Sequence, residues 1–194
     1  GKPVHIVSGD YCNIKVTTPN DIAVAKRYLG IEDKRMRVGF GYDIHQLKAG
    51  RPCILGGVHI ESDLGPDGHS DADVLIHALM DAMLGAAGLR DIGYYFPPED
   101  DQYKGISSML LLEKVNFLLK ERGLQAYNID IMVISETPKL KPHIDMMKSN
   151  LQSILEIPLD RISIKATTNE MLGAIGRREG IAAQAVVSVY EGEV

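Results

Sequence analysis

Two spacings of hydrophobic and polar positions recur along the chain, and each predicts one kind of secondary structure. Alternation with a period of two indicates strands, whereas apolar residues spaced three and four apart indicate helices. Strands are predicted at 37–45, 52–60, 128–135, 161–166 and 182–190, and helices at 70–85, 107–121 and 144–156. Because strands and helices interleave without a regular repeat, we expect an α+β fold, a mixed open sheet with helices packed on one face.

Residues 1–35 form a separate pattern. They predict a pair of strands followed by one helix, in which Thr18 is the N-cap and Asp21 completes a capping box. The charged stretch 32–35 follows, so we expect a boundary there, with 36–194 as the main domain. So short a segment buries too little apolar surface to fold alone, and we expect it to pack on the main domain, on another chain, or on nothing.

Composition narrows the functional classes. With 194 residues, a formal net charge of −5, 45% hydrophobic and 24% charged residues, the chain has the make-up of a soluble globular protein. It has no block of Lys and Arg for a phosphate backbone, so we expect no nucleic-acid partner. Without an apolar run of roughly 20 residues or a secretory signal, we expect a cytoplasmic protein with no membrane partner. The scattered Cys12 and Cys53 predict reduced thiols.

Three residues with metal-binding side chains fall where a strand and a helix could bring them together. Asp43 and His45 sit two apart in a predicted strand, so both side chains leave from the same face. His77 lies on a predicted helix, at the edge of its apolar arc. Two imidazoles and one carboxylate suit zinc and leave one coordination position open, as in catalytic zinc sites. The alternative is that His77 is a packed polar residue.

The start of the same helix carries His69, Ser70 and Asp73. One interpretation is purely structural, because Ser70 and Asp73 can cap free backbone N–H groups. His69 precedes the predicted cap and lies outside the apolar stripe. It could therefore donate to a phosphate that approaches the helix start.

A second candidate phosphate site follows the strand predicted at 161–166. The hydroxyls of Thr167 and Thr168 offer donors, and the glycine-rich turn 173–180 adds backbone N–H groups and arginines. Glu170 could hold a hard ion such as magnesium together with substrate phosphates. The alternative is a capping box made by Thr167 and Glu170.

A loop with two prolines follows the strand predicted at 128–135. The backbone groups of residues 135–142 are held in fixed directions, which makes this loop a candidate ligand site. The alternative is a connecting loop whose two lysines are merely solvated.

Together these motifs give residues 36–194 a close resemblance to the 2-C-methyl-D-erythritol 2,4-cyclodiphosphate synthase family of non-mevalonate isoprenoid biosynthesis. The resemblance rests on GFGYDIH, ILGGVHI, GHSDADVLIHALMDAMLGAAGLRDIGYYFP, the proline loop and KATTNEMLGAIGRREGIAAQAV, all in the family's order. It implies a lyase in which the 2-phosphate of 4-diphosphocytidyl-2-C-methyl-D-erythritol 2-phosphate attacks the terminal phosphorus of the diphosphate, closing a ring and expelling CMP. Two alternatives stay open: a metal-dependent phosphohydrolase that uses water, and a non-catalytic trimeric scaffold.

The resemblance also implies roles for the candidate residues. It assigns Zn²⁺ to Asp43, His45 and His77, and a second ion, Mg²⁺ or Mn²⁺, to Glu170. It assigns transition-state contacts to His69 and Thr168. Contacts with the cytidine diphosphate substrate are implied for Asp43, His45, Ser70, Asp91, Ile92, Gly93, Phe96, Pro97, Pro98, Glu99, Asp100, Ser135, Glu136, Thr137, Pro138, Lys139, Leu140, Lys141, Thr167, Asn169, Glu170 and Arg177.

Members of this family are homotrimers with active sites between neighbouring protomers, so the resemblance implies the same assembly here. One position departs from the pattern. Ala174 stands where many members have an aromatic residue, which enlarges the local space, whereas Arg177 still matches.

The N-terminal segment resembles a different family. Residues 1–29, through GDYCNIKVTTPNDIAVAKRYL, are similar to the closing segment of 2-C-methyl-D-erythritol 4-phosphate cytidylyltransferases, which occur fused to the cyclodiphosphate synthase in bifunctional enzymes. Lys15 matches a substrate-contacting lysine of that family. Because the nucleotide-binding part is missing, we expect a fragment without transferase activity, for which the missing cytidylyltransferase domain is a candidate partner.

Overall fold

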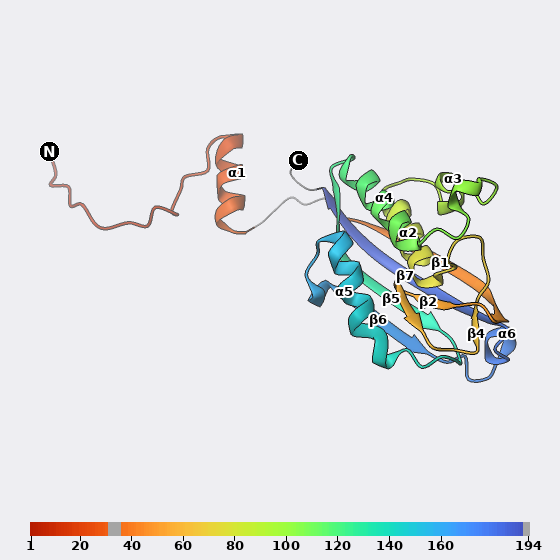
Figure 1. Ribbon diagram of the computed structural model, residues 1–194. Helices are drawn as coiled ribbons and strands as arrows, with labels where there is room; N and C mark the ends of the chain where they lie inside the picture. The colour runs from red at the N-terminus through yellow and green to blue at the C-terminus, as the bar shows by residue number, and fades with distance from the viewer. Residues whose placement is uncertain (31–35, 192–194) are drawn as a thin grey trace. The chain divides into compact units, whose positions relative to one another are not determined.

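The computed structural model describes residues 1–30 and 36–191, and the chain divides into two compact units, Gly1–Lys34 and Arg35–Val194 (Figure 1). The first unit contains one helix, α1 (Pro19–Tyr28). The Thr18 hydroxyl accepts from the backbone N–H of Asp21, and the Asp21 carboxylate accepts from the backbone N–H of Thr18, so the predicted capping box is confirmed.

The strand pair predicted before this helix is wrong, because residues 1–18 contain no strand. Val4, Ile6 and Val7 are almost fully exposed. A two-stranded pair that covers no apolar surface is at best marginally stable in water, which explains why the alternating pattern here does not become a hairpin. The charged stretch 32–35 of the predicted boundary lies outside the described residues.

The second unit contains all the remaining elements. Its strands are β1 (Met36–Ala49), β2 (Cys53–Leu55), β3 (Val58–Ile60), β4 (Leu64–Pro66), β5 (Leu124–Ile134), β6 (Ile162–Thr167) and β7 (Gly180–Glu191). Its α-helices are α2 (Val74–Ala86), α3 (Ile92–Tyr95), α4 (Ser108–Lys120), α5 (Ile144–Leu155) and α6 (Gly173–Gly176), with 3₁₀ turns at Asp101–Tyr103, Lys141–His143 and Leu159–Arg161. Within the described ranges, no helix is both long enough and apolar enough to cross a membrane.

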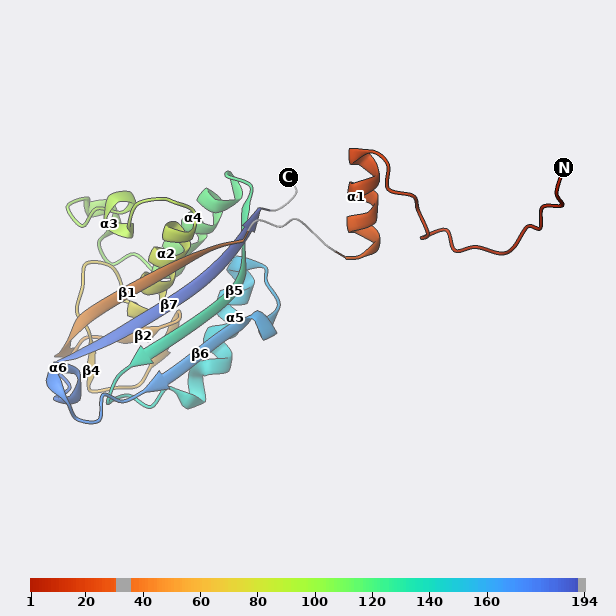
Figure 2. The ribbon, with the colours of Figure 1, turned by 180° about the vertical axis from the view of Figure 1, so that it is seen from behind.

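The main sheet has five strands in the order β4-β1-β7-β5-β6. β5 and β6 run parallel, and the other neighbouring pairs run antiparallel. The helices α2, α4 and α5 cover one face, and Figure 2 shows the strands of the other face in front of them. The predicted α+β fold, with a mixed sheet and helices on one face, is confirmed.

Two local predictions need correction. Residues 52–60 form a hairpin of β2 and β3 instead of one strand, because Gly56 and Gly57 both have positive φ and make the two-residue turn that such hairpins prefer. The N-cap of α2 is Asp73 and not Ser70. Ala72 has a left-handed φ of 58°, so the right-handed helix can begin only after it. The Asp73 carboxylate then accepts from the backbone N–H of Ile76.

Two glycines on β1 allow α2 to lie directly on the strand. A Cβ atom at Gly41 would stand 2.0 Å from the carbonyl oxygen of Ala78, and one at Gly39 would stand 1.9 Å from that of Ala82. Any side chain at these positions would push the helix away, because real Cβ atoms do not approach so closely. The contact buries nearly all of α2 and sets the helix at a fixed height above β1.

The opposite face of the sheet exposes apolar side chains. On β1 these are Val38, Phe40, Tyr42 and Ile44, with exposed fractions of 64%, 61%, 47% and 48%. Val186 on β7, which pairs with Phe40, continues the surface. Contiguous exposed apolar patches are uncommon on monomeric proteins and often mark the surface that contacts a partner. This face of the sheet is therefore a candidate interaction surface.

Cys53 and Cys12 are expected to differ sharply in reactivity. Both are free thiols, as predicted, but Cys12 is exposed whereas Cys53 is buried on β2. Burial, together with the negative charge of Asp73, raises the pKa of Cys53 to about 11. Because the thiolate is the nucleophile, Cys53 stays protonated and inert at neutral pH.

A chromogenic disulfide reagent should titrate one thiol rapidly in the folded protein and both after unfolding. With Cys12→Ser no rapid phase should remain, and two rapid phases in the native protein would contradict the assignment.

Candidate functional site

The three predicted metal ligands converge on one point. Asp43 Oδ2 lies 2.9 Å from His45 Nε2 and 3.0 Å from His77 Nδ1, and the two histidine nitrogens are 3.1 Å apart. Asp43 and His45 leave β1 on the face that carries Gly39 and Gly41, and α2 presents His77 from directly above that face. The alternation of side chains along β1 and the close contact of α2 with that strand therefore bring the three side chains together.

The outer nitrogens of both histidines have partners of their own. His45 Nδ1 lies 2.8 Å from the carbonyl oxygen of Asp67, which can only accept, so Nδ1 carries the proton. His77 Nε2 lies 3.1 Å from Ser70 Oγ and 3.0 Å from Ser108 Oγ. A hydroxyl can accept as well as donate, so His77 Nε2 can carry its proton too, and in that state the nitrogens that face Asp43 present lone pairs. Three lone-pair atoms at this spacing repel one another unless a cation lies between them.

Without an ion, a proton on the histidines can take the place of that cation, so the triad attracts positive charge in either case. Burial alone would raise the pKa of Asp43, but hydrogen bonds and positive charge from His45 and His77 hold it well below its usual range. Burial alone would lower the pKa of His45, but the hydrogen bond and charge of Asp43 raise it. The ligand atoms of tetrahedral zinc, with bonds of about 2.1 Å, lie about 3.4 Å apart, so this donor set fits zinc in both chemistry and spacing.

A cavity of about 300 Å³ opens over the triad. His69 lines this cavity, and its Nε2 is shielded from solvent and has no hydrogen-bond partner among the described residues. Tyr103 and Leu111 also line this cavity, although the sequence analysis did not predict them. In the sequence, a tyrosine or a leucine at a cavity looks the same as one in the hydrophobic core. Predicted site residues that line the cavity are Asp43, His45, His69, Ser70, His77, Ile92, Gly93, Phe96 and Pro98.

A second group of predicted residues gathers elsewhere. The Glu136 carboxylate accepts from the backbone N–H groups of Asn169, at 3.0 Å, and Met171, at 3.1 Å, and so ties the loop after β5 to the loop after β6. The Thr168 hydroxyl donates to the Glu170 carboxylate at 3.1 Å. The capping-box alternative for this loop is wrong, because the next helix, α6, begins only at Gly173 and lacks a side-chain cap.

Arg177 and Arg178 lie beyond this loop. The Arg177 guanidinium donates to the Glu179 carboxylate at 2.8 Å, and both side chains are exposed. The hydrogen bond and charge of Glu179 raise the pKa of Arg177, so it is a cation at any physiological pH. Arg178 has φ 63° and lines a different cavity from the triad.

The sheet order separates the two groups within one chain. Ile44 on β1 pairs with Ala182 on β7. Ala182 also pairs with Ile134 on β5, which in turn pairs with Thr167 on β6. Thr167 therefore lies level with the metal ligands but three strand spacings away, which at about 4.8 Å per spacing is about 14 Å. The strand order therefore places the start of the Thr167–Glu170 loop well away from the candidate metal ligands of the same chain.

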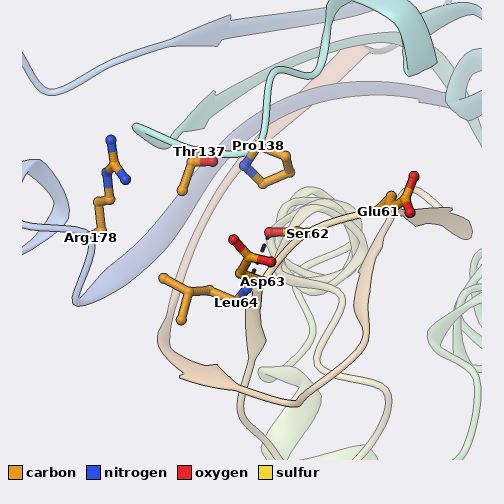
Figure 3. A pocket seen from close by; sticks show the side chains of 7 residues that line it. All are labelled: Glu61, Ser62, Asp63, Leu64, Thr137, Pro138 and Arg178. Atoms are coloured by element: carbon orange, nitrogen blue, oxygen red, sulfur yellow. Dashed lines mark hydrogen bonds between the residues drawn. The ribbon is translucent and has the colours of Figure 1, made fainter.

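A larger cavity, of about 660 Å³, lies beside the second group and does not include the triad. Figure 3 shows Ser62 and Asp63 beside the loop at Thr137 and Pro138, with Arg178 to one side. The proline loop thus lines a hollow, as a ligand site would, but its partners in this chain come from the β3–β4 connection and not from the metal ligands.

Comparisons with known proteins agree with this geometry. Residues 36–190 match the model of the YgbB family. The 2-C-methyl-D-erythritol 2,4-cyclodiphosphate synthase of Synechococcus elongatus is 59% identical over 152 residues, which cover 78% of this chain and 95% of that protein. The IspF of Plasmodium falciparum, solved as a CDP complex, superposes with a TM-score of 0.72 at 32% identity, covering 81% of this chain and 97% of that one.

Bifunctional proteins match both units of the chain. The bifunctional enzyme IspD/IspF of Desulforudis audaxviator is 51% identical over 97% of this chain, and the bifunctional IspDF of Campylobacter jejuni superposes with a TM-score of 0.79 at 39% identity over 96%. This chain spans about half of each, 48% and 50%. The predicted resemblance to a fusion is confirmed. The chain belongs to the YgbB family, that of the 2-C-methyl-D-erythritol 2,4-cyclodiphosphate synthases.

Proposed function

We propose that this chain converts 4-diphosphocytidyl-2-C-methyl-D-erythritol 2-phosphate into 2-C-methyl-D-erythritol 2,4-cyclodiphosphate and CMP. An oxygen of the 2-phosphate forms a bond to the terminal phosphorus of the diphosphate, and the bond from that phosphorus to the CMP oxygen breaks. The observation that carries the proposal is the convergence of Asp43 Oδ2, His45 Nε2 and His77 Nδ1 at the floor of a cavity.

The triad offers a donor set for one ion, and we assign a second ion to Glu170. Asp43, His45 and His77 would hold zinc, and Glu170 would hold magnesium or manganese. Such ions polarise phosphoryl oxygens and neutralise the charge that builds up as the leaving group departs. The attacking phosphate is already anionic at neutral pH, so the site needs no side-chain nucleophile and base.

The remaining work of the site is to position one molecule against itself. Both reacting phosphates belong to the same substrate, so folding it into an in-line geometry supplies much of the rate. The partnerless Nε2 of His69 is well placed to donate to a phosphate oxygen above the triad. We assign Thr168 the matching role on the diphosphate, residues 91–93 and 96–100 the methylerythritol and sugar hydroxyls, and residues 135–141 the cytosine base.

We further propose that the enzyme is a homotrimer whose active sites form between protomers. The separation of about 14 Å between the triad strand and Thr167 supports this, because a neighbouring protomer would then supply the second group to each site. The exposed apolar face at Val38, Phe40 and Tyr42 offers the surface for association.

Phosphorus NMR of the reaction products tests the proposal. The protein is mixed with 4-diphosphocytidyl-2-C-methyl-D-erythritol 2-phosphate, with and without divalent metal and chelator. We expect metal-dependent CMP and a cyclic diphosphate. Linear phosphates would identify a phosphohydrolase instead, and unchanged substrate with an assembled trimer would identify a scaffold.

A further inference from the structure

A buried hydroxyl that the proposed chemistry does not use lies against the outer nitrogen of His77. Ser108, the first residue of α4, is fully buried, and its Oγ is 3.0 Å from His77 Nε2. The same oxygen lies 2.5 Å from Asp71 Oδ1, while Asp71 Oδ2 accepts the backbone N–H of Ser108 at 2.9 Å. Asp71 therefore accepts hydrogen bonds from both the hydroxyl and the backbone N–H of Ser108. The hydroxyl links Asp71 to His77, the candidate metal ligand.

The chemistry of the three groups sets the direction of the hydrogen bonds. An ionised carboxylate only accepts, so the single hydrogen of the Ser108 hydroxyl is directed to Asp71. The lone pairs of that hydroxyl are then left for His77, which must donate from Nε2. A neutral imidazole that carries its proton on Nε2 has a bare Nδ1, and Nδ1 is the atom that faces Asp43 and His45.

Ser70 also contacts His77 Nε2, at 3.1 Å, but it does not impose this direction. Its oxygen accepts the backbone N–H of Ala72 at 3.2 Å, and no carboxylate contact is recorded for it among the described hydrogen bonds, so its hydrogen stays free to turn. Ser70 also lines the cavity, where that hydrogen can turn toward a ligand.

We propose that Asp71 and Ser108 are positioning residues for the metal centre, which hold His77 in the Nε2–H tautomer and present Nδ1 to zinc. This inference rests on the proposed zinc site and adds two residues to which the resemblance assigned no role. Outer-shell partners of this kind typically change metal affinity 10–100-fold. A purely structural role, anchoring the start of α4, predicts no such change in zinc affinity or tautomer.

The first measurement is the ¹⁵N spectrum of the His77 imidazole in the metal-free wild-type protein, taken at a pH where the ring is neutral, which reports the tautomer without any substitution. The Nε2–H form is expected, and an Nδ1–H form would overturn the inference. Zinc affinity is then measured by competition with a chromophoric chelator. Ser108→Ala should lose roughly 10–100-fold, and Ser108→Thr, which keeps the hydroxyl, should restore both the affinity and the tautomer.

Ser107→Ala is the matched control. Ser107 is the N-cap of the same helix, and its hydroxyl accepts from the backbone N–H of Met109. Its loss should destabilise α4 and leave zinc affinity unchanged. If Ser108→Ala binds zinc as tightly as the wild type, the positioning role of Asp71 and Ser108 is wrong, while the proposed zinc site stands. If the wild type itself binds no zinc, the proposed function fails and this inference with it.

Discussion

His45→Ala is expected to lose zinc and nearly all turnover while the fold and the assembly survive. The substitution removes one of three protein ligands, and the remaining two, Asp43 and His77, cannot enclose an ion of tetrahedral preference. Zinc affinity should fall further than the roughly 10–100-fold that outer-shell partners account for. Zinc content after dialysis, by atomic absorption, and product formation, by phosphorus NMR, check the result.

His59→Ala provides the matched control for His45→Ala. His59 lies on β3 with its side chain exposed and outside the triad, so its removal should change neither zinc content nor turnover. Size-exclusion chromatography with light scattering on both variants separates loss of metal from loss of assembly. A His45→Ala protein that retains stoichiometric zinc would refute the ligand assignment.

Gly41→Ala is expected to destabilise the protein by roughly 3 kcal/mol or more, at or above the usual range for overpacking. The added Cβ would stand 2.0 Å from the carbonyl oxygen of Ala78 and 2.7 Å from the amide nitrogen of Ala82. Both are backbone atoms of α2, so the helix can yield only by moving as a whole. Because His77 precedes Ala78, the shift should also weaken zinc binding. Denaturant unfolding and chelator competition measure the two effects.

The same substitution at Gly85 is the control. Gly85 lies on α2, but a Cβ there would meet its nearest atoms at 4.0 Å, which is ordinary contact. Alanine favours the helix interior over glycine by about 0.5–1 kcal/mol, so Gly85→Ala should leave stability unchanged or raise it. A Gly41→Ala variant as stable as the wild type would contradict the close contact between α2 and β1.

Local rules recovered most of the secondary structure, and their failures have local causes. The capping box at Thr18 formed as predicted, since it involves only a few neighbouring residues. The alternating pattern at 52–60 was interpreted as one strand, although two successive glycines with positive φ turn the chain back on itself. The cap at Ser70 failed because Asp73, three residues later, bonds both Ile76 and the distant Gly57.

The sequence alone determined which side chains share a face of β1. The period of two places Gly39, Gly41, Asp43 and His45 on one side, so the glycines that admit a helix and the residues that bind beneath it are in line. Only the tertiary structure decided that α2 is that helix, with His77 over Asp43, and that β7 and β5 separate the triad from Thr167. Strand order and helix docking depend on contacts between residues far apart in the chain, and local periodicity carries no information about them.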